Sequence, residues 1–376
     1  MGKPSTITPS VPAVIFCAES TGKFQIAALT LLDRLIVTLH RAACAPITIV
    51  CDGPWPNLRR SAAWRISVNF VASAPICSGP TLVAEASVLV QPCDITALLH
   101  ERGRLTASDG TPLPIGVVNG FSSDPSQALL ALPSVRAQGV AFAVTDNDSA
   151  RRAERALWQS LTSSSDGWVD RHFNRPVGRP LSKLLIHTPV SPNTVSIVSI
   201  LIGLVAAGLF AIGNYAMSIT AAVLFQISAI IDCVDGDIAR AVFKESPLGK
   251  WLDLAGDQVV HVAVFAAIAI GLWRQNTETP ELWLGISAVT GALLSFAVVL
   301  RGLKRMTEKS NNLLRRIIDS ATNRDFSVLV FGLAVADILE LFLWMTAVGT
   351  HLFWITLLFL QRGNARIART TLPTAP

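Results

Sequence analysis

Two pairs of aspartates lie inside the long apolar stretches of this 376-residue chain. Asp232 and Asp235 are three residues apart near the end of one apolar run, and Asp253 and Asp257 are four apart near the start of the next. An ionised carboxylate at the centre of a membrane-spanning helix costs about 3 kcal/mol even on the most lenient insertion scale. Four such carboxylates need a compensating positive charge, and we expect a functional site there.

The composition divides the chain into two kinds of sequence. Hydrophobic residues make up 51% of the chain and charged residues only 15%, which is too apolar for a soluble enzyme of this length. The apolar stretches are concentrated in residues 193–361, whereas residues 1–190 mix Pro, Ser and charged residues. The net charge is +5, but the basic residues flank apolar runs and form no stripe with interleaved aromatics, so we expect no nucleic-acid partner. The six cysteines lack metal-ligand spacing and are expected to be reduced thiols.

The first 161 residues are expected to form a soluble α/β domain, because short apolar runs alternate with amphipathic ones. The expected strands are residues 12–18, 46–51, 68–72, 87–91 and 141–144, and the expected helices are residues 26–43, 95–102 and 150–161.

Residues 162–191 form a basic connector. Arg171, Arg175, Arg179 and Lys183 recur near helical spacing, and Leu181, Leu184 and Leu185 supply an apolar side. The pattern favours a helix on an anionic membrane surface. A solvated linker is the alternative.

Residues 192–362 are expected to form a membrane domain of six transmembrane helices, each near the ~20 residues needed to cross a bilayer. The expected spans are residues 193–213, 215–241, 249–273, 280–300, 325–340 and 342–361. Basic residues gather between spans two and three, between spans four and five, and in the tail at residues 363–376. The positive-inside rule then predicts a multi-pass protein of the cytoplasmic (inner) membrane with both termini cytoplasmic.

The aspartate spacings place each pair on one helix face, and a hairpin of adjacent helices can bring the two faces together. An all-oxygen site of this kind suits Mg²⁺ or Mn²⁺. Two such ions could hold a diphosphate as its P–O bond breaks. An ion-paired structural cluster is the alternative, but Arg240 alone cannot neutralise four carboxylates.

The ordered pattern D-x2-D-G-x2-A-R-x8-G-x3-D-x3-D resembles that of the CDP-alcohol phosphotransferase family, and every position is present here. The resemblance implies a six-helix membrane enzyme that uses an acceptor hydroxyl to displace CMP from a CDP-alcohol. It also implies roles for particular residues: Asp232, Asp235 and Asp253 as ligands of two Mg²⁺ or Mn²⁺ ions, Asp257 as the base for the acceptor hydroxyl and a further metal contact, and Gly236, Ala239, Arg240 and Gly249 around the cytidine and its phosphates.

The residues leave the substrates open. The donor is either CDP-diacylglycerol or a soluble CDP-polyol, and the acceptor is a hydroxyl compound such as inositol phosphate or another polyol phosphate. We expect contact with membrane lipids and a homodimer. Lys250, Arg301, Lys304 and Arg305 are candidates for an acceptor phosphate, although membrane topology alone also accounts for them.

The order of a soluble domain, a basic connector and this motif resembles the fused di-myo-inositol-phosphate phosphate synthase branch of the family, whose front domain is similar to a nucleotidyltransferase. That resemblance implies a Gly-rich phosphate loop after the first strand, but residues 17–23 contain one glycine, with Lys23 as a remaining phosphate contact. Asp94 lies where a metal-binding aspartate would be expected. We therefore predict a degenerate front domain without cytidylyltransferase activity.

Two other functions compete with this one. A catalytically silent scaffold would not need the complete motif, and aspartate-motif prenyltransferases lack the Gly-x2-Ala-Arg segment. Two nearby residues lie outside the pattern: His261 is interpreted as packed between helices, with proton relay as its alternative, and Asp237 is predicted to face the polar rim.

Overall fold

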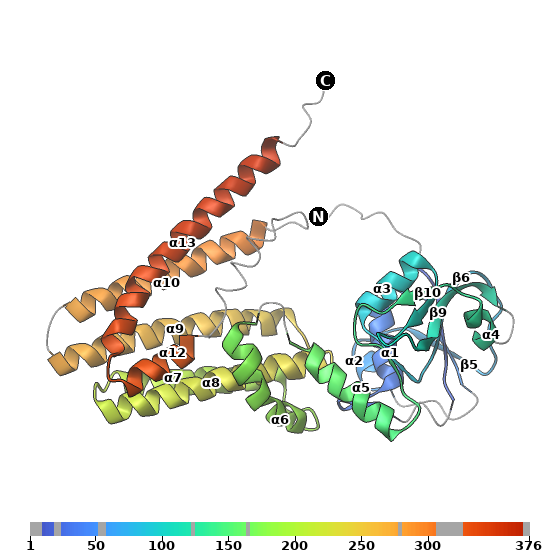
Figure 1. Cartoon of the computed structure of the whole chain (residues 1–376), viewed down its shortest axis with the longest axis horizontal. Helices are drawn as coiled ribbons and strands as arrows, with labels where there is room; N and C mark the ends of the chain where they lie inside the picture. Colours follow the sequence, from blue (N-terminus) through green and yellow to red (C-terminus); the bar gives the residue numbers. More distant parts are fainter. Residues whose placement is uncertain are drawn as a thin grey trace. The chain divides into compact units, whose positions relative to one another are not determined.

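The computed structural model describes residues 10–18, 24–51, 58–121, 125–162, 166–276, 280–305 and 326–370. The chain forms two compact units (Figure 1). The first comprises Met1–Leu161 with Ala241–Phe243, and the second comprises Thr162–Arg240 with Lys244–Pro376.

The first unit is built on a seven-stranded mixed sheet in the order β10-β8-β9-β6-β1-β4-β5. Strands β6, β1, β4 and β5 run parallel, whereas β9 is antiparallel to both β6 and β8. The strands are β1 (Ala13–Phe16), β2 (Gln25–Ile26), β3 (Leu29–Thr30), β4 (Ile47–Val50), β5 (Val68–Val71), β6 (Cys77–Glu85), β7 (Val88–Leu89), β8 (Arg104–Thr106), β9 (Pro112–Phe121), β10 (Ser134–Arg136) and β11 (Phe142–Ala143). The helices are α1 (Leu31–Arg41), α2 (Arg60–Ala63), α3 (Pro92–Glu101), α4 (Pro125–Leu130) and α5 (Asn147–Ser160).

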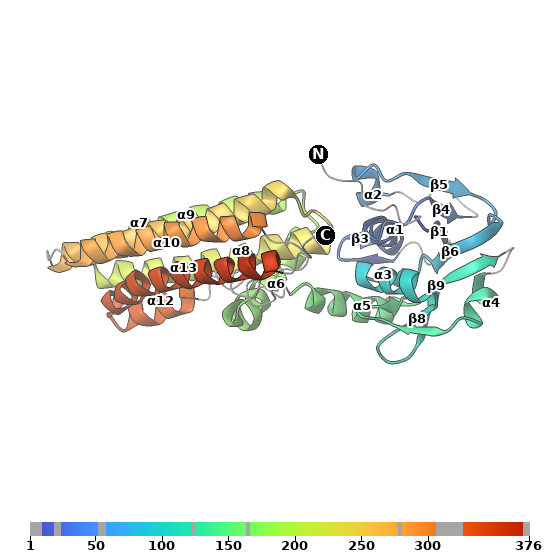
Figure 2. The same cartoon turned by 90° about the horizontal axis from the view of Figure 1, so that it is seen from above.

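Alternate residues of the central strands bury opposite faces of this sheet. Ile15 of β1 packs with Leu35 of α1 and Leu98 of α3, whereas Val14 packs with Val83 and with Leu129 of α4. Figure 2 shows α1 and α3 on one side of the sheet and α4, which contacts β9, on the other. A parallel strand buried on both faces reads as a continuous apolar run, which is why β1 was predictable.

The helix expected over residues 26–43 is shorter than predicted. Residues 25–30 instead form a small hairpin in which Ala27 and Ala28 both have positive φ, at 46° and 62°. Arg34 is buried and donates to the carbonyls of Ile26 and Ala27 at 2.8 and 3.1 Å. A turn of this type usually contains Gly or Asn. Because Ala27 and Ala28 occupy these positions here, the sequence did not indicate a turn.

The second unit consists of a connector and a bundle of long apolar helices. The connector contains a π-helical turn η1 (Asp170–Asn174) that runs into α6 (Arg175–Leu185). The bundle helices are α7 (Pro192–Phe210), α8 (Tyr215–Ala241), α9 (Pro247–Asn276), α10 (Pro280–Arg305), α12 (Phe326–Val335) and α13 (Leu339–Thr370).

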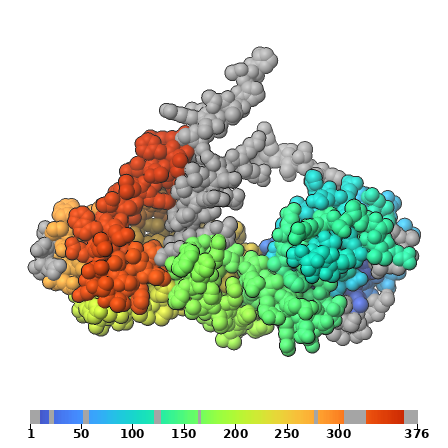
Figure 3. Space-filling view, in the orientation of Figure 1, coloured from blue at the N-terminus to red at the C-terminus, as the bar shows by residue number. Residues whose placement is uncertain are grey.

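Five of the described helices are long and apolar enough to cross a membrane: α7, α8, α9, α10 and α13. Four of them cover the first four expected spans with small shifts at the ends. The expected span over residues 325–340 corresponds mainly to α12, whose 10 residues extend about 15 Å at 1.5 Å per residue. Only 22% of the most apolar window of α13 is buried within the protein, and this helix forms much of the bundle surface in Figure 3. An exposed apolar surface of that extent is typical of a surface that contacts a membrane or another protein.

Helices α7 and α9 pack closely next to the motif aspartates of α9. An ideal Cβ on Gly256 of α9 would lie 2.2 Å from Cδ1 of Ile200 on α7, so any larger residue there would force the Ile200 side chain to shift. Helix α7 begins at a well-formed cap, because Ser191 Oγ accepts from the Thr194 N–H at 3.1 Å and Pro192 occupies the first turn.

Candidate functional site

Three of the four motif aspartates converge between α8 and α9. One carboxylate oxygen from each of Asp232, Asp235 and Asp253 lies within 4.8 Å of the other two. Asp235 is buried, Asp232 is half-buried and Asp253 is exposed. Carboxylate oxygens at this spacing match the donor set of a hard divalent cation, so the residues fit Mg²⁺ or Mn²⁺.

Two serines of α7 hold the carboxylates of α8 in place. Ser196 Oγ donates a short hydrogen bond to Asp235 Oδ2, and Ser199 Oγ donates to Asp232 Oδ1 at 3.2 Å. Both serines are buried. Hydrogen-bonded supports of this kind orient ligands for a metal, and they were not predicted from the sequence.

A pocket of about 250 Å³ opens beside these carboxylates. All four predicted donor-binding residues line it: Gly236, Ala239, Arg240 and Gly249. Lys244 and Lys250 add positive charge to its wall. The pocket therefore combines small residues, cationic side chains and a carboxylate cluster, which is the chemistry that a metal-bound diphosphate requires.

The two motif glycines make room for specific polar groups. An ideal Cβ on Gly236 would lie 3.0 and 3.1 Å from Nη2 and Nη1 of Arg240, so the guanidinium rests against the bare backbone of α8. At Gly249 a Cβ would lie 2.9 Å from Oδ1 of Asn193, and the Gly249 N–H donates to Ser246 Oγ at 2.9 Å. The absence of a side chain at Gly236 and Gly249 thus lets the Arg240 guanidinium and the Asn193 amide lie close to the helix backbone.

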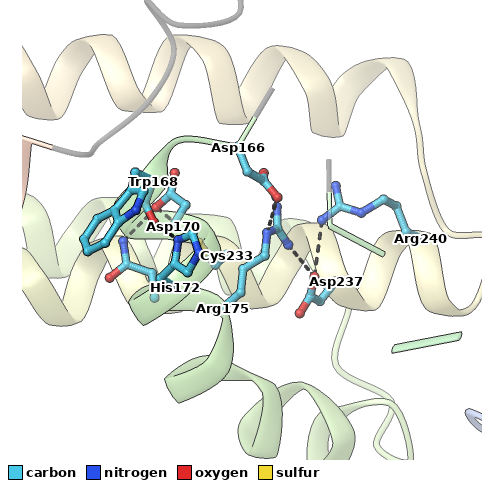
Figure 4. Close-up of polar contacts among 9 residues, drawn as sticks. Asp166, Trp168, Asp170, His172, Arg175, Cys233, Asp237 and Arg240 are labelled. Atoms are coloured by element: carbon cyan, nitrogen blue, oxygen red, sulfur yellow. Dashed lines mark hydrogen bonds and ion pairs between the residues drawn. The ribbon is translucent and has the colours of Figure 1, made fainter. Parts of the chain in front are cut away.

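A buried ion network joins the connector to α8 (Figure 4). Arg175 donates from Nε and Nη2 to the two oxygens of Asp166, each at 2.6 Å, and from Nη1 to Asp237 Oδ1 in a short ion pair. Arg240 Nη2 reaches the same Asp237 oxygen at 3.3 Å. Burial alone would lower the pKa of Arg175, but its bonds to Asp166 and the charge of Asp237 outweigh it and raise that pKa.

This network corrects two expectations. Arg175 does not belong to an exposed basic face, because it is only 5% exposed, and Asp237 does not face the polar rim, because it is only 1% exposed. Next to them, Asp170 Oδ1 accepts from Asn174 Nδ2 at 2.7 Å, and Asn174 Oδ1 accepts from Gln226 of α8 at 2.6 Å. These bonds tie η1 to the membrane helix.

Asp257 lies one turn beyond Asp253 and lines a different cavity, of about 400 Å³. The wall is mainly apolar, with Phe265, Phe296 and Phe353 among its residues. His261 shares this wall and packs against Phe326, with ring centroids 4.8 Å apart. The structure thus places His261 both between helices and beside Asp257, so both of its interpretations stay open.

In the first unit, Asp94 has a structural role. Its carboxylate is fully buried and accepts from the backbone N–H groups of Gln91, Gln138 and Gly139 at 2.8–2.9 Å. These bonds cap α3 and anchor a neighbouring loop, so this carboxylate is already engaged with protein donors. Of the segment 17–23, where the resemblance implies a phosphate loop, residues 19–23 lie outside the described residues.

Residues 189–360 match the CDP-alcohol phosphatidyltransferase family. This part of the chain is a CDP-alcohol phosphatidyltransferase domain. The match covers the whole aspartate motif and the bundle helices from α7 to the greater part of α13.

Similarity to curated proteins reaches beyond this phosphatidyltransferase domain. The bifunctional IPC transferase and DIPP synthase of Thermococcus kodakarensis is 28% identical over 222 residues, covering 56% of this chain and 49% of that protein. The protein of the same description from Rubrobacter xylanophilus is 32% identical over 144 residues, covering 38% and 31%. The chain thus spans about half or less of the length of these curated relatives. A crystal structure of Mycobacterium tuberculosis phosphatidylinositol phosphate synthase with CDP-DAG bound is 17% identical, covers 49% of this chain and 93% of that one, and has a TM-score of 0.38.

Proposed function

We propose that this protein is an integral-membrane CDP-alcohol phosphotransferase, which moves a phospho-alcohol group from a CDP-alcohol to an acceptor hydroxyl and releases CMP. The observation that carries the proposal is the convergence of Asp232, Asp235 and Asp253 beside a pocket lined by the family's glycines, alanine and arginine. The names of the similar proteins, which include an archaetidylinositol phosphate synthase of Pyrococcus horikoshii, support the same class of reaction.

The proposed reaction forms one P–O bond and breaks another. Asp257 accepts the proton of the acceptor hydroxyl, and the acceptor oxygen attacks the phosphorus that carries the donor's alcohol. The bond from that phosphorus to the bridging oxygen breaks, and the oxygen leaves with CMP. Asp232, Asp235 and Asp253 would hold two divalent ions, which supply positive charge to the diphosphate as its charge shifts to the leaving group. Arg240 would hold a phosphate oxygen at the pocket wall.

The cavity beside Asp257 supports a lipid as one substrate. Its mainly apolar lining suits an alkyl chain better than a polyol, because burying hydroxyl groups without partners is costly. We therefore propose a CDP-diacylglycerol-type donor and a polyol or polyol-phosphate acceptor. The basic side chains of Lys244 and Lys250 at the other pocket are suited to an acidic acceptor.

We propose that α12 and α13 complete a six-helix bundle in the cytoplasmic membrane, with both termini cytoplasmic. We further propose that the connector lies on the membrane surface. Its exposed side carries Phe173, Val177, Leu181 and Leu184, at spacings of three and four residues. Such a stripe on a short helix is typical of an interfacial segment. The homodimer remains an expectation.

The test is CMP release by the purified full-length protein in detergent, with Mn²⁺ or Mg²⁺ and a panel of CDP-alcohol donors and hydroxyl acceptors. Loss of a general base typically costs about 10²–10⁴-fold in rate, so Asp257→Asn should lower turnover by that order. Asp337→Asn is the matched control, because Asp337 is exposed and lies at the turn between α12 and α13. CMP release that is unaffected by Asp257→Asn would refute the proposed mechanism. The absence of CMP release with every donor–acceptor pair would favour the catalytically silent scaffold. Extraction of the product into organic solvent separates a lipid product from a soluble one.

We also propose that the first unit lacks cytidylyltransferase activity. The structural role of Asp94 supports this, because its carboxylate already accepts three backbone N–H groups. The full-length protein should release no pyrophosphate from CTP with an alcohol phosphate. Metal-dependent pyrophosphate release would show that the domain is an active nucleotidyltransferase.

A further inference from the structure

Arg175 and Asp237 are charged groups that the reaction does not use directly, yet both are buried. Their side chains are 6% and 1% exposed, and that of Asp166 is 7% exposed. Charges are buried only at a large desolvation cost, so a network of this kind calls for a physical explanation. The connector contributes Asp166 and Arg175, and α8 contributes Asp237 and Arg240.

The two arginines differ in how they bind Asp237. Arg175 uses Nε, Nη1 and Nη2 at once, which fixes its planar guanidinium between Asp166 and Asp237. Arg240 makes a longer contact of 3.3 Å, is 31% exposed, and lies against Gly236 at the wall of the donor pocket. Arg175 thus satisfies most of the charge of Asp237, while Arg240 stays at the pocket.

We propose that Arg175 is a positioning residue for donor binding: by neutralising Asp237 from the connector side, it keeps the Arg240 guanidinium at the pocket wall, where a phosphate of the CDP group binds. This inference rests on the proposed function. Without Arg175, Arg240 would be the cation in direct contact with the buried Asp237 carboxylate, with Arg179 as a further positive charge acting on it. Asp237 would then draw the Arg240 guanidinium away from the pocket. The connector would then control affinity for the nucleotide without touching it.

The alternative is that Arg175 only staples the connector to α8. The two roles differ in their coupling to Arg240. If Arg175 only fixes the connector to α8, any effect of its substitution on CDP binding should be the same with and without Arg240. If Arg175 positions Arg240, its substitution should have no effect on CDP binding once Arg240 has been replaced. Residues of one network typically couple by an amount that a double-mutant cycle resolves.

The experiment measures the Kd of CDP for the full-length protein in detergent with Mn²⁺, by isothermal titration calorimetry. Arg240→Gln should weaken CDP binding by about tenfold or more, because it removes a charge-assisted hydrogen bond. Arg175→Gln should weaken it by about fivefold, within the range measured for coupled residues. The double variant should bind CDP as Arg240→Gln does. Arg171→Gln is the matched control, since Arg171 is an exposed arginine of the same connector, and it should leave the Kd unchanged.

Three results would overturn the proposal: independent, multiplicative effects of the two substitutions, an unchanged Kd in folded Arg175→Gln, or an equal loss of binding in Arg171→Gln. If Arg175→Gln does not fold, Asp166→Asn takes its place, because it removes the bidentate anchor and keeps the Arg175–Asp237 pair. Its weaker effect should also vanish in the Arg240→Gln background. Absence of CDP binding to the unsubstituted protein would overturn the proposed function, and with it this inference. CDP binding that is insensitive to Arg175 and Asp166 would overturn this inference alone.

Discussion

Replacing Asp235 with Asn should stabilise the metal-free protein and abolish its stabilisation by metal. Oxygens of Asp232, Asp235 and Asp253 lie within 4.8 Å of one another. At that distance two unit charges repel by about 0.9 kcal/mol in water and by about 3.5 kcal/mol at an effective dielectric constant of about 20. The Asn substitution removes two of the three pairs, which amounts to about 2 to about 7 kcal/mol.

The substitution is otherwise conservative. The Asn side chain keeps an oxygen that can accept from Ser196, which now donates to Asp235 Oδ2. In EDTA at pH 8, where ordinary aspartates are ionised, the variant should melt at least about 4 °C above the unsubstituted protein. With Mn²⁺ at a hundred times its Kd, the unsubstituted protein should gain about 2.7 kcal/mol of stability that the variant does not gain, so the difference between the two melting temperatures should shrink by that amount.

Thermal melting in detergent, followed by tryptophan fluorescence with EDTA or Mn²⁺, measures both effects. Asp337→Asn is the control, because Asp337 is exposed and its φ of 58° is readily adopted by Asn. The control should keep the metal response of the unsubstituted protein. The electrostatic reasoning is refuted if Asp235→Asn melts below the unsubstituted protein in EDTA, or if both proteins gain equally from Mn²⁺.

Three further predictions follow from single contacts. Gly236→Ala should displace the Arg240 guanidinium, which lies 3.0 Å from the new Cβ position, and should raise the Kd of CDP severalfold by calorimetry without changing the melting temperature of the first unit. Asp94→Asn should destabilise the first unit by about 1–3 kcal/mol, since the new amide cannot serve all three backbone donors, and chemical denaturation measures this loss. Under native conditions at pH 7.5, DTNB should label Cys93 faster than Cys44. Cys93 is exposed, although partial burial and the neighbouring Asp94 raise its pKa, whereas Cys44 is 2% exposed and burial raises its pKa to about 11, so labelling of Cys44 as fast as Cys93 would contradict the fold.

The predictable features of this chain are those encoded by local sequence patterns. The strand at Ala13–Phe16 and the long apolar helices follow from continuous apolar runs, short in the first case and near 20 residues in the second. The pairing of the motif aspartates on helix faces follows from the helical repeat of about 3.6 residues. The hairpin at Ala27 and Ala28 was missed because its turn lacks Gly or Asn. Strands β6 and β9 were missed as well, since Pro80 and Pro114 interrupt their apolar patterns.

Contacts between residues far apart in sequence carry no local pattern. Arg175 and Asp237 are 62 residues apart, and nothing in the spacing of the basic residues distinguishes Arg175 from Arg171. The hydrogen bond from Ser196 to Asp235 joins residues 39 apart in sequence, and no local sequence pattern predicts it either. The aspartates that converge at the candidate site were therefore identifiable from the sequence, whereas the groups that hydrogen-bond to them required the fold.

The position of Asp257 gives the site two compartments. Asp253 and Asp257 share one face of α9, but the first lies beside the carboxylates of α8 and the second lines the apolar cavity. One helical turn, about 5.4 Å along the axis, therefore separates the candidate metal cluster from the candidate base. A reacting phosphorus must lie within reach of both groups, so the two substrates must meet along this single turn of α9. The geometry accounts for why the motif requires the second aspartate pair to be four residues apart: a spacing of two or five would turn the Asp257 carboxylate away from the face that Asp253 occupies.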